Sequence, residues 1–302
     1  MKRIALTVFF LAALYAAGFI FGKNHAARLE KLAMQLPVYF DNGFRPTSYP
    51  IEERSFVVVV IAHNNGAFVE KSLASIFSQH YPRYRVIYID DGSTDGSASL
   101  ASDLIASGGQ KEIVQFVRHP DQIGELAHLS SIVKDLDDQE IVVWLGGKDQ
   151  LAHEWVLEHV NAYYADPELW MTYGQYREVP GYRLGKSAPF QRDLWEKKGF
   201  RGHPFVATHL KTFYAGLFKQ IDPVDFTYQG AFLSSAAEEA VMIPLLELAR
   251  DHFQFVPEVL CLVRQHVPTI EEAELSSRGE RYIRSLSSYE PLRYLFVRGL
   301  DE

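Results

Sequence analysis

Two neighbouring carboxylates, Asp90 and Asp91, directly follow a short apolar run in the sequence. Val86 to Ile89 are β-branched or aromatic and include no turn residue, which predicts a strand covered on both faces of a parallel sheet. The turn residues Gly92 to Gly96 come next, so both acids would lie at the carboxyl end of that strand. Ligands bind at this edge of an open α/β sheet, where a carboxylate can accept the imide N–H of uracil or a related base.

On its own, this pattern is also typical of an ordinary turn and helix cap. The segment upstream favours the binding interpretation. Phe56 to Ile61 is a second continuous apolar run, and Phe68 to Gln79 carries apolar residues at helical spacing, with Val69, Leu73 and Ile76 on one face. The chain from Phe56 to Ile89 is therefore expected to form a strand, a loop, a helix and a second strand.

Three stretches together resemble the nucleotide-binding half of family 2 glycosyltransferases. They read Val-Val-Val-Val-Ile-Ala-His-Asn-Asn, Ser-Leu-Ala-Ser-Ile-Phe-Ser-Gln and Ile-Asp-Asp-Gly-Ser-Thr-Asp-Gly. The resemblance implies a GT-A fold, which is a Rossmann-like α/β fold with a mainly parallel sheet flanked by helices. It also implies a nucleoside diphosphate sugar as donor, bound by Ala62, His63, Asn64, Asp90, Asp91 and Gly124.

The metal motif of this family is altered here. Ile141 to Leu145 predicts a third buried strand, and Gly146-Gly147-Lys148-Asp149 follows it, where the family carries an Asp-x-Asp pair that holds Mn²⁺ or Mg²⁺. Gly146 and Lys148 replace the two acids, which leaves Asp149 as the possible ligand. A hard divalent cation needs oxygen ligands and is repelled by an ammonium group. Either Lys148 meets the charge of the diphosphate itself, or the protein binds without turnover.

A candidate general base lies later in the chain. The stretch from Ala236 to Ala249 resembles the family segment whose leading acid, usually aspartate, acts as the base; Glu238 falls at that position and Glu239 is the alternative. An inverting transfer needs one carboxylate within hydrogen-bond reach of the acceptor hydroxyl. From spacing alone, both are equally well first-turn glutamates favoured by the helix dipole. Glu247, further along, is expected to pack structurally.

The resemblance assigns further contacts. His209 and Lys211 lie in a stretch similar to the family segment that lines the donor and acceptor cleft, so they are predicted acceptor contacts. Arg264 and His266 follow the last predicted strand, where relatives place polar residues that close over the diphosphate. Lys148, Asp149 and His266 are therefore the predicted diphosphate contacts.

The amino terminus predicts a membrane anchor. Ile4 to Gly22 carries no charge, and a helix of this length at ~1.5 Å per residue would span about 28 Å, close to the hydrocarbon core of a bilayer. A cleaved signal peptide is the alternative. Basic residues flank both ends, so the membrane side of the domain stays open. We expect an anchor at residues 1–23, a stalk at 24–54, the GT-A domain at 55–270 and a basic amphipathic tail at 271–302, which would lie on a membrane or cap the domain.

Composition limits the partners. The formal net charge of -8, from 38 acidic and 30 basic residues, argues against a nucleic-acid-binding surface. The single cysteine, Cys261, excludes an intramolecular disulfide.

The sequence predicts an anchored glycosyltransferase that acts with inversion on a glycan, lipid or protein acceptor. The alternatives are a catalytically degenerate binder of sugar nucleotides or glycans, and a membrane-tethered scaffold.

Overall fold

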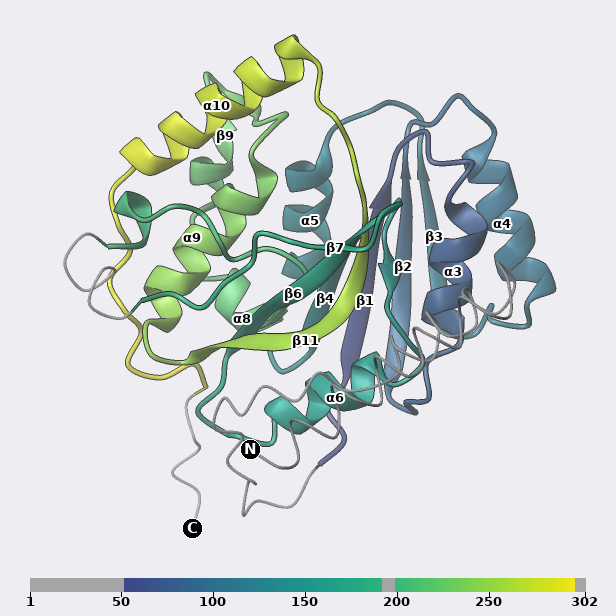
Figure 1. Cartoon of the computed structure of the whole chain (residues 1–302), viewed down its shortest axis with the longest axis horizontal. Coiled ribbons are helices and arrows are strands. Elements are labelled where there is room, and N and C mark those ends of the chain that lie inside the picture. Colours follow the sequence, from purple (N-terminus) through teal and green to yellow (C-terminus); the bar gives the residue numbers. More distant parts are fainter. Residues whose placement is uncertain (1–51, 192–198, 297–302) are drawn as a thin grey trace, which may run out of the picture. The chain divides into compact units, whose positions relative to one another are not determined.

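The computed structural model describes residues 52–191 and 199–296 (Figure 1). Within these residues, nine strands form one sheet in the order β3-β2-β1-β4-β8-β6-β11-β5, and β7 pairs with β6. The strands are β1 (Phe56–Ala62), β2 (Tyr84–Asp91), β3 (Val114–His119), β4 (Ile141–Gly146), β5 (Gln150–Leu151), β6 (Met171–Val179), β7 (Arg183–Leu184), β8 (Lys211–Tyr214) and β11 (Phe253–Arg264).

The first four long strands form the parallel half of the sheet. β1 pairs in parallel with β2 and β4, and β2 pairs in parallel with β3. All of β1 is buried, as expected for a central strand that is covered on both faces. The register places Ala62 opposite Asp90 and Ile61 opposite Gly146. The carboxyl ends of β1, β2 and β4 therefore meet at one edge, as the sequence predicts.

Helices cover both faces of the sheet. Figure 1 shows α3 and α4 on one side of the parallel half and α5, α8, α9 and α10 on the opposite side. The helices are α3 (Val69–Phe77), α4 (Ser97–Ser107), α5 (Glu125–Lys134), α6 (Val156–Tyr163), α8 (Ala215–Phe218), α9 (Ala237–Ala249) and α10 (Ile270–Ser285). The predicted apolar face of α3 is confirmed, because Val69, Leu73 and Ile76 are buried.

The second half of the sheet mixes strand directions. β8 pairs antiparallel with both β4 and β6, whereas β11 runs parallel to β6. All four residues of β8 are buried, including Lys211. β8 thus carries a cation into the interior beside the ends of the parallel strands, and that cation needs a partner.

A buried ion pair joins the last helices to the domain. Glu247 of α9 accepts hydrogen bonds from Arg201 Nε and Nη2, each at 2.8 Å, and from Tyr289 N at 3.1 Å. Arg201 lies in the short 3-10 helix η1 (Phe200–Gly202), and Tyr289 follows α10. The expected structural role of Glu247 is confirmed. α10 itself packs on this part of the domain through the buried Ile283.

The predicted anchor at residues 1–23 and nearly all of the predicted stalk lie outside the described residues, as does the end of the predicted tail. In the part of the chain that the structure describes, no helix combines the length and the apolar character needed to cross a membrane. The tail prediction begins within α10, whose first turn carries Glu271 and Glu272.

Replacing Glu247 by alanine should destabilise the domain by about 3 to 5 kcal/mol, because it leaves the Arg201 charge buried without a partner. Urea unfolding followed by circular dichroism measures the change. Glu178→Ala is the control, because its partner Arg183 is largely exposed. Equal unfolding midpoints for the two variants would show that the Glu247 pair does not support the fold.

Candidate active site

The converging ends of β1, β2 and β4 open into a pocket of about 390 Å³. This volume lies in the range of small-molecule sites. The residues that line it and that carry the argument below are Ala62, His63, Asn65, Asp91, Gly124, Glu125, Gly146, Gly147, Lys148, Asp149, Ser234 and Arg264.

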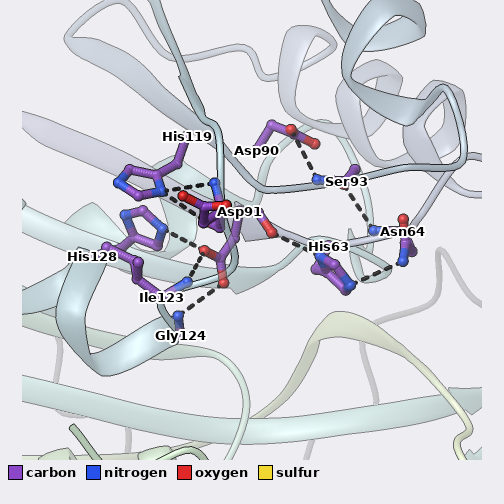
Figure 2. Close-up of polar contacts among 10 residues, drawn as sticks. His63, Asn64, Asp90, Asp91, Ser93, His119, Ile123, Gly124 and His128 are labelled. Atoms are coloured by element: carbon purple, nitrogen blue, oxygen red, sulfur yellow. Dashed lines mark hydrogen bonds and ion pairs between the residues drawn. The ribbon is translucent and has the colours of Figure 1, made fainter. Parts of the chain in front are cut away.

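Asp91 holds one wall of the pocket together (Figure 2). Its carboxylate accepts the N–H groups of Ile123 at 2.8 Å and Gly124 at 3.0 Å, and His128 Nε2 lies 2.8 Å from Oδ1. Burial disfavours the ionised carboxylate, but these contacts outweigh burial and lower the pKa of Asp91. Gly124 has a φ of +93°, which favours glycine at this turn. Asp91 therefore fixes the loop between β3 and α5 while remaining ionised.

The loop after β1 is tied to the turn after β2. His63 Nδ1 lies 2.7 Å from the Asp91 carbonyl oxygen, and Asn64 N donates to Ser93 Oγ at 2.9 Å (Figure 2). Asp90 is 1% exposed and accepts the N–H of Ser93 at 3.2 Å. Of the predicted nucleotide contacts, Ala62, His63, Asp91 and Gly124 line the pocket. Asn64 and Asp90 instead support the turn.

Three residues in or beside this pocket were missed by the sequence analysis. Asn65 lines the pocket and donates to the Gly147 carbonyl at 2.6 Å. Glu125, the first residue of α5, lines the pocket and accepts the Trp144 indole N–H at 2.9 Å. His128 completes the partners of Asp91. Only the position of Glu125 and His128 just after Gly124 could have suggested them.

The turn after β4 is closely packed. A Cβ atom on Gly146 would lie 2.6 Å from Asp149 Oδ2, and one on Gly147 would lie 2.5 Å from the Ala62 Cβ. Asp149 is 6% exposed and its Oδ1 accepts the Arg264 N–H at 2.9 Å. Burial raises the pKa of Asp149 to about 7, against the opposing effect of the Arg264 hydrogen bond. Asp149 therefore changes charge close to neutral pH.

These residues do not fit a resident divalent cation. Asp149 is the one carboxylate in this turn, and one of its oxygens is already engaged by Arg264 N. A Cβ atom at position 146 would lie 2.6 Å from Asp149 Oδ2, so an acid there would displace the Asp149 side chain from its present place. Among the described residues, no group of three or more His, Cys, Asp or Glu side chains is placed to hold a metal ion. Lys148 and Arg264 also line the pocket, and both side chains are cations, which repel a metal ion instead of binding it.

Three predicted residues meet beside the pocket in one charged cluster. Lys211 is 3% exposed; its Nζ lies 2.5 Å from Glu238 Oε1 and 4.2 Å from the centre of the Trp144 ring. His209 Nε2 lies 3.3 Å from Glu238 Oε1 and 3.6 Å from Asp149 Oδ2. His209 thus links the cluster to the pocket wall.

The cluster keeps Glu238 ionised. Burial disfavours the carboxylate, but Lys211 and His209 outweigh burial and lower the pKa of Glu238 to about 2. Burial, with Lys211 nearby, lowers the pKa of His209 to about 4, so the imidazole is neutral at neutral pH. Burial lowers the pKa of Lys211, but the nearby carboxylates of Glu238 and Glu125 outweigh burial and raise that pKa overall. Lys211 therefore keeps its positive charge.

Two predicted site residues lie elsewhere. Glu239 is partly buried next to Glu238, and burial raises its pKa, but it does not line the pocket. The His266 side chain is 65% exposed, and its Nε2 lies 3.2 Å from Glu272 Oε2. Arg264, two residues before it, lines the pocket in its place.

The sequence profile of glycosyl transferase family 2 matches residues 57–223, more than half of the chain, and the chain therefore belongs to this family. No curated protein matches it. Similar solved structures include S. aureus TarS 1-349 in complex with UDP-GlcNAc, with a TM-score of 0.55 and 14% identity over 71% of this chain and 60% of that one. The mannosyltransferase PcManGT from Pyrobaculum calidifontis, in complex with GDP-Man and Mn²⁺, has a TM-score of 0.54 and 17% identity over 94% of this chain and 77% of that one.

These likenesses show the fold, an α/β GT-A fold with a mostly parallel sheet flanked by helices, as the sequence predicts. The chain covers 37% of the length of one TarS structure and between 60% and 64% of the length of three structures of TarS 1-349. The neighbours bind sugar nucleotides, and the family is one of enzymes that transfer sugars.

Replacing Asp91 by asparagine should speed amide hydrogen exchange at Ile123 and Gly124 by roughly 5- to 150-fold, because an amide NH₂ would face an N–H donor and cost about 1 to 3 kcal/mol. Exchange measured by NMR gives the result. Asp95→Asn serves as control, since Asp95 accepts instead from Gly66 and Ser97. Unchanged exchange in the Asp91 variant would mean that the carboxylate does not hold this loop.

Proposed function

We propose that this protein transfers a sugar from a nucleoside diphosphate sugar to an acceptor hydroxyl with inversion. The observation that carries the proposal is the position of the Glu238 cluster beside the pocket at the strand ends, linked to it by His209 and Asp149. This arrangement offers a binding pocket and an ionised carboxylate at its side. Membership of the family supports the reaction class.

The donor would bind with its base towards Asp91 and His63 and its diphosphate towards Lys148 and Arg264. The two basic side chains line the same pocket as the two base contacts. A lysine ammonium and an arginine guanidinium are both good phosphate partners. They would stabilise the charge that develops on the leaving diphosphate, since the residues present do not fit a divalent cation.

Glu238 would accept the proton of the acceptor hydroxyl. A carboxylate with a pKa of about 2 is a weak base, because Lys211 and His209 stabilise its charge. The diphosphate of an arriving donor adds negative charge near this cluster. It would compete for the attraction of Lys211 and raise the pKa of Glu238 towards that of an effective base.

The same features favour a second function, a sugar-nucleotide or glycan binding protein without turnover. Gly146 and Lys148 stand where the family holds its metal, and Glu238 is strongly paired before any donor binds. Loss of one preorganised charge-stabilising group commonly costs ~3 to 4 kcal/mol of barrier. Activity therefore depends on whether Lys148 and Arg264 replace that stabilisation.

Calorimetric titration of the full chain with UDP-GlcNAc and GDP-mannose, with Mn²⁺ and with EDTA, tests the proposal together with an assay for released nucleoside diphosphate. We expect binding that EDTA does not weaken, and turnover that it does not abolish. Binding without turnover would favour the second function. Absence of binding with both donors would contradict the nucleotide pocket.

Glu238→Gln should reduce transfer by about 100-fold or more without weakening donor binding, because the variant cannot accept the proton and leaves the Lys211 charge free to attract the diphosphate. Glu239→Gln is the matched control and should retain activity. Glu238→Asp tests the fold independently, since it preserves a counter-charge for Lys211. Wild-type turnover in the Gln variant would remove Glu238 from the catalytic role.

Donor affinity should rise about three- to ten-fold as the pH falls from 8 to 6. The Asp149 carboxyl, with its pKa raised to about 7, is largely ionised at pH 8 and repels the diphosphate, whereas at pH 6 it is largely neutral. UDP-GlcNAc is a suitable probe, because its diphosphate keeps the same charge in this range. Asp149→Asn should flatten the profile, and Asp103→Asn on α4 should not. A wild-type profile in the Asp149 variant would contradict this assignment.

A further inference from the structure

A second pocket, of about 440 Å³, lies between α10 and the hairpin of β9 (Thr227–Tyr228) and β10 (Ala231–Phe232). The residues that carry the inference are Tyr228, Phe232, Ser234, Arg278, Arg281 and Tyr282, all of which line it. None of the predicted donor contacts belongs to it, and the mechanism above does not use it.

This second pocket adjoins the donor pocket. Ser234 lines both, and the chain runs from Ser234 directly into α9, whose second residue is Glu238. Gly279 lets α10 approach this loop closely, because a Cβ atom there would lie 2.9 Å from Ser235 Oγ. Ser235 Oγ in turn donates to the Leu275 carbonyl at 3.1 Å. A molecule in the second pocket would therefore contact the loop that joins the donor pocket to the first turn of α9.

The walls of the second pocket present aromatic rings. Tyr228 is 44% exposed and Phe232 is 41% exposed, although both lie in a concave surface. Tyr282 packs against Tyr228 with ring centroids 4.8 Å apart, and its hydroxyl donates to the Thr227 carbonyl at 2.8 Å. Rings held in this way offer large, rigid contact surfaces to the apolar face of a sugar ring.

Two guanidinium groups complete the second pocket. Arg278 and Arg281 are three residues apart on α10 and therefore share a face of the helix. Within the described residues, neither makes a hydrogen bond or an ion pair. Glu280, which lies between them in sequence, is bound to Arg284. Two unpaired guanidiniums beside aromatic rings match a phosphate or carboxylate carried on a sugar.

We propose that this second pocket is the acceptor subsite and that it selects an acidic glycan, a sugar that carries a phosphate or a carboxylate. The proposal rests on the proposed transfer reaction and names the class of its acceptor. The aromatic rings would hold the sugar, and Arg278 and Arg281 would hold its anionic group. The hydroxyl to be glycosylated would then lie towards Ser234 and Glu238.

Binding to the full chain can be measured by ligand-observed NMR titration with methyl glucoside, its 6-phosphate, methyl glucuronide and inorganic phosphate. We expect at least one acidic glycoside to bind five-fold or more tightly than methyl glucoside, and more tightly than inorganic phosphate. The double variant Arg278→Gln with Arg281→Gln should lose this preference. Lys71→Gln with Lys134→Gln removes two exposed charges elsewhere and should keep it. Phe232→Ala should weaken binding of all three glycosides.

Preference for the phosphate or for the carboxylate supports the proposal and identifies the group. Equal binding of the three glycosides to the wild type, or a preference that survives the double arginine variant, overturns it. Tighter binding of inorganic phosphate than of the phosphorylated glycoside also overturns it, because the sugar would then contribute nothing. UDP-GlcNAc binding, measured in parallel, should not change in the double variant. If the wild type binds the acidic glycoside but no donor, the transfer reaction is contradicted while the acidic-sugar site stands.

Discussion

The structure depends on the requirement that every charge taken out of water finds a partner. Asp91, Glu238 and Glu247 are each withdrawn from solvent to some degree, and each is met by donors from another element of the fold. An unpaired buried charge would cost several kcal/mol. Each carboxylate therefore fixes the relative position of two segments that are distant in sequence.

Each of these three carboxylates joins a different pair of segments. Asp91 attaches the loop before α5 to the end of β2 and shapes one wall of the pocket. Glu238 draws α9 towards Lys211 on β8, so the proposed base lies beside the sheet edge. Glu247, nearly three turns along α9, anchors the same helix to η1 through Arg201. Both ends of α9 are thus held by ion pairs, and the orientation of Glu238 follows from them.

The departure from the family metal motif is a matter of packing as well as of charge. Gly147 allows the turn after β4 to approach Ala62, and Gly146 allows Asp149 to fold back beneath it. Of the two motif positions, an acid at 146 would displace the Asp149 side chain, whereas position 148 already carries a side chain that lines the pocket. The positive charges that line the pocket come from Lys148 and from Arg264 at the end of β11.

The sequence by itself determined β1, β2 and β4 of the parallel half, helix α3 and the family, because apolar runs and helical spacing are local patterns that burial on two faces imposes. It did not predict β3 or α5, which the structure adds beside them. It also located His63, Asp91, Gly124 and Asp149, which follow strands or precede a helix. Only the tertiary structure decided that Lys211 is the partner of Glu238 and that Arg264 rather than His266 enters the pocket. These outcomes depend on antiparallel pairing and on helix packing between distant segments, and neither leaves a local pattern in the chain.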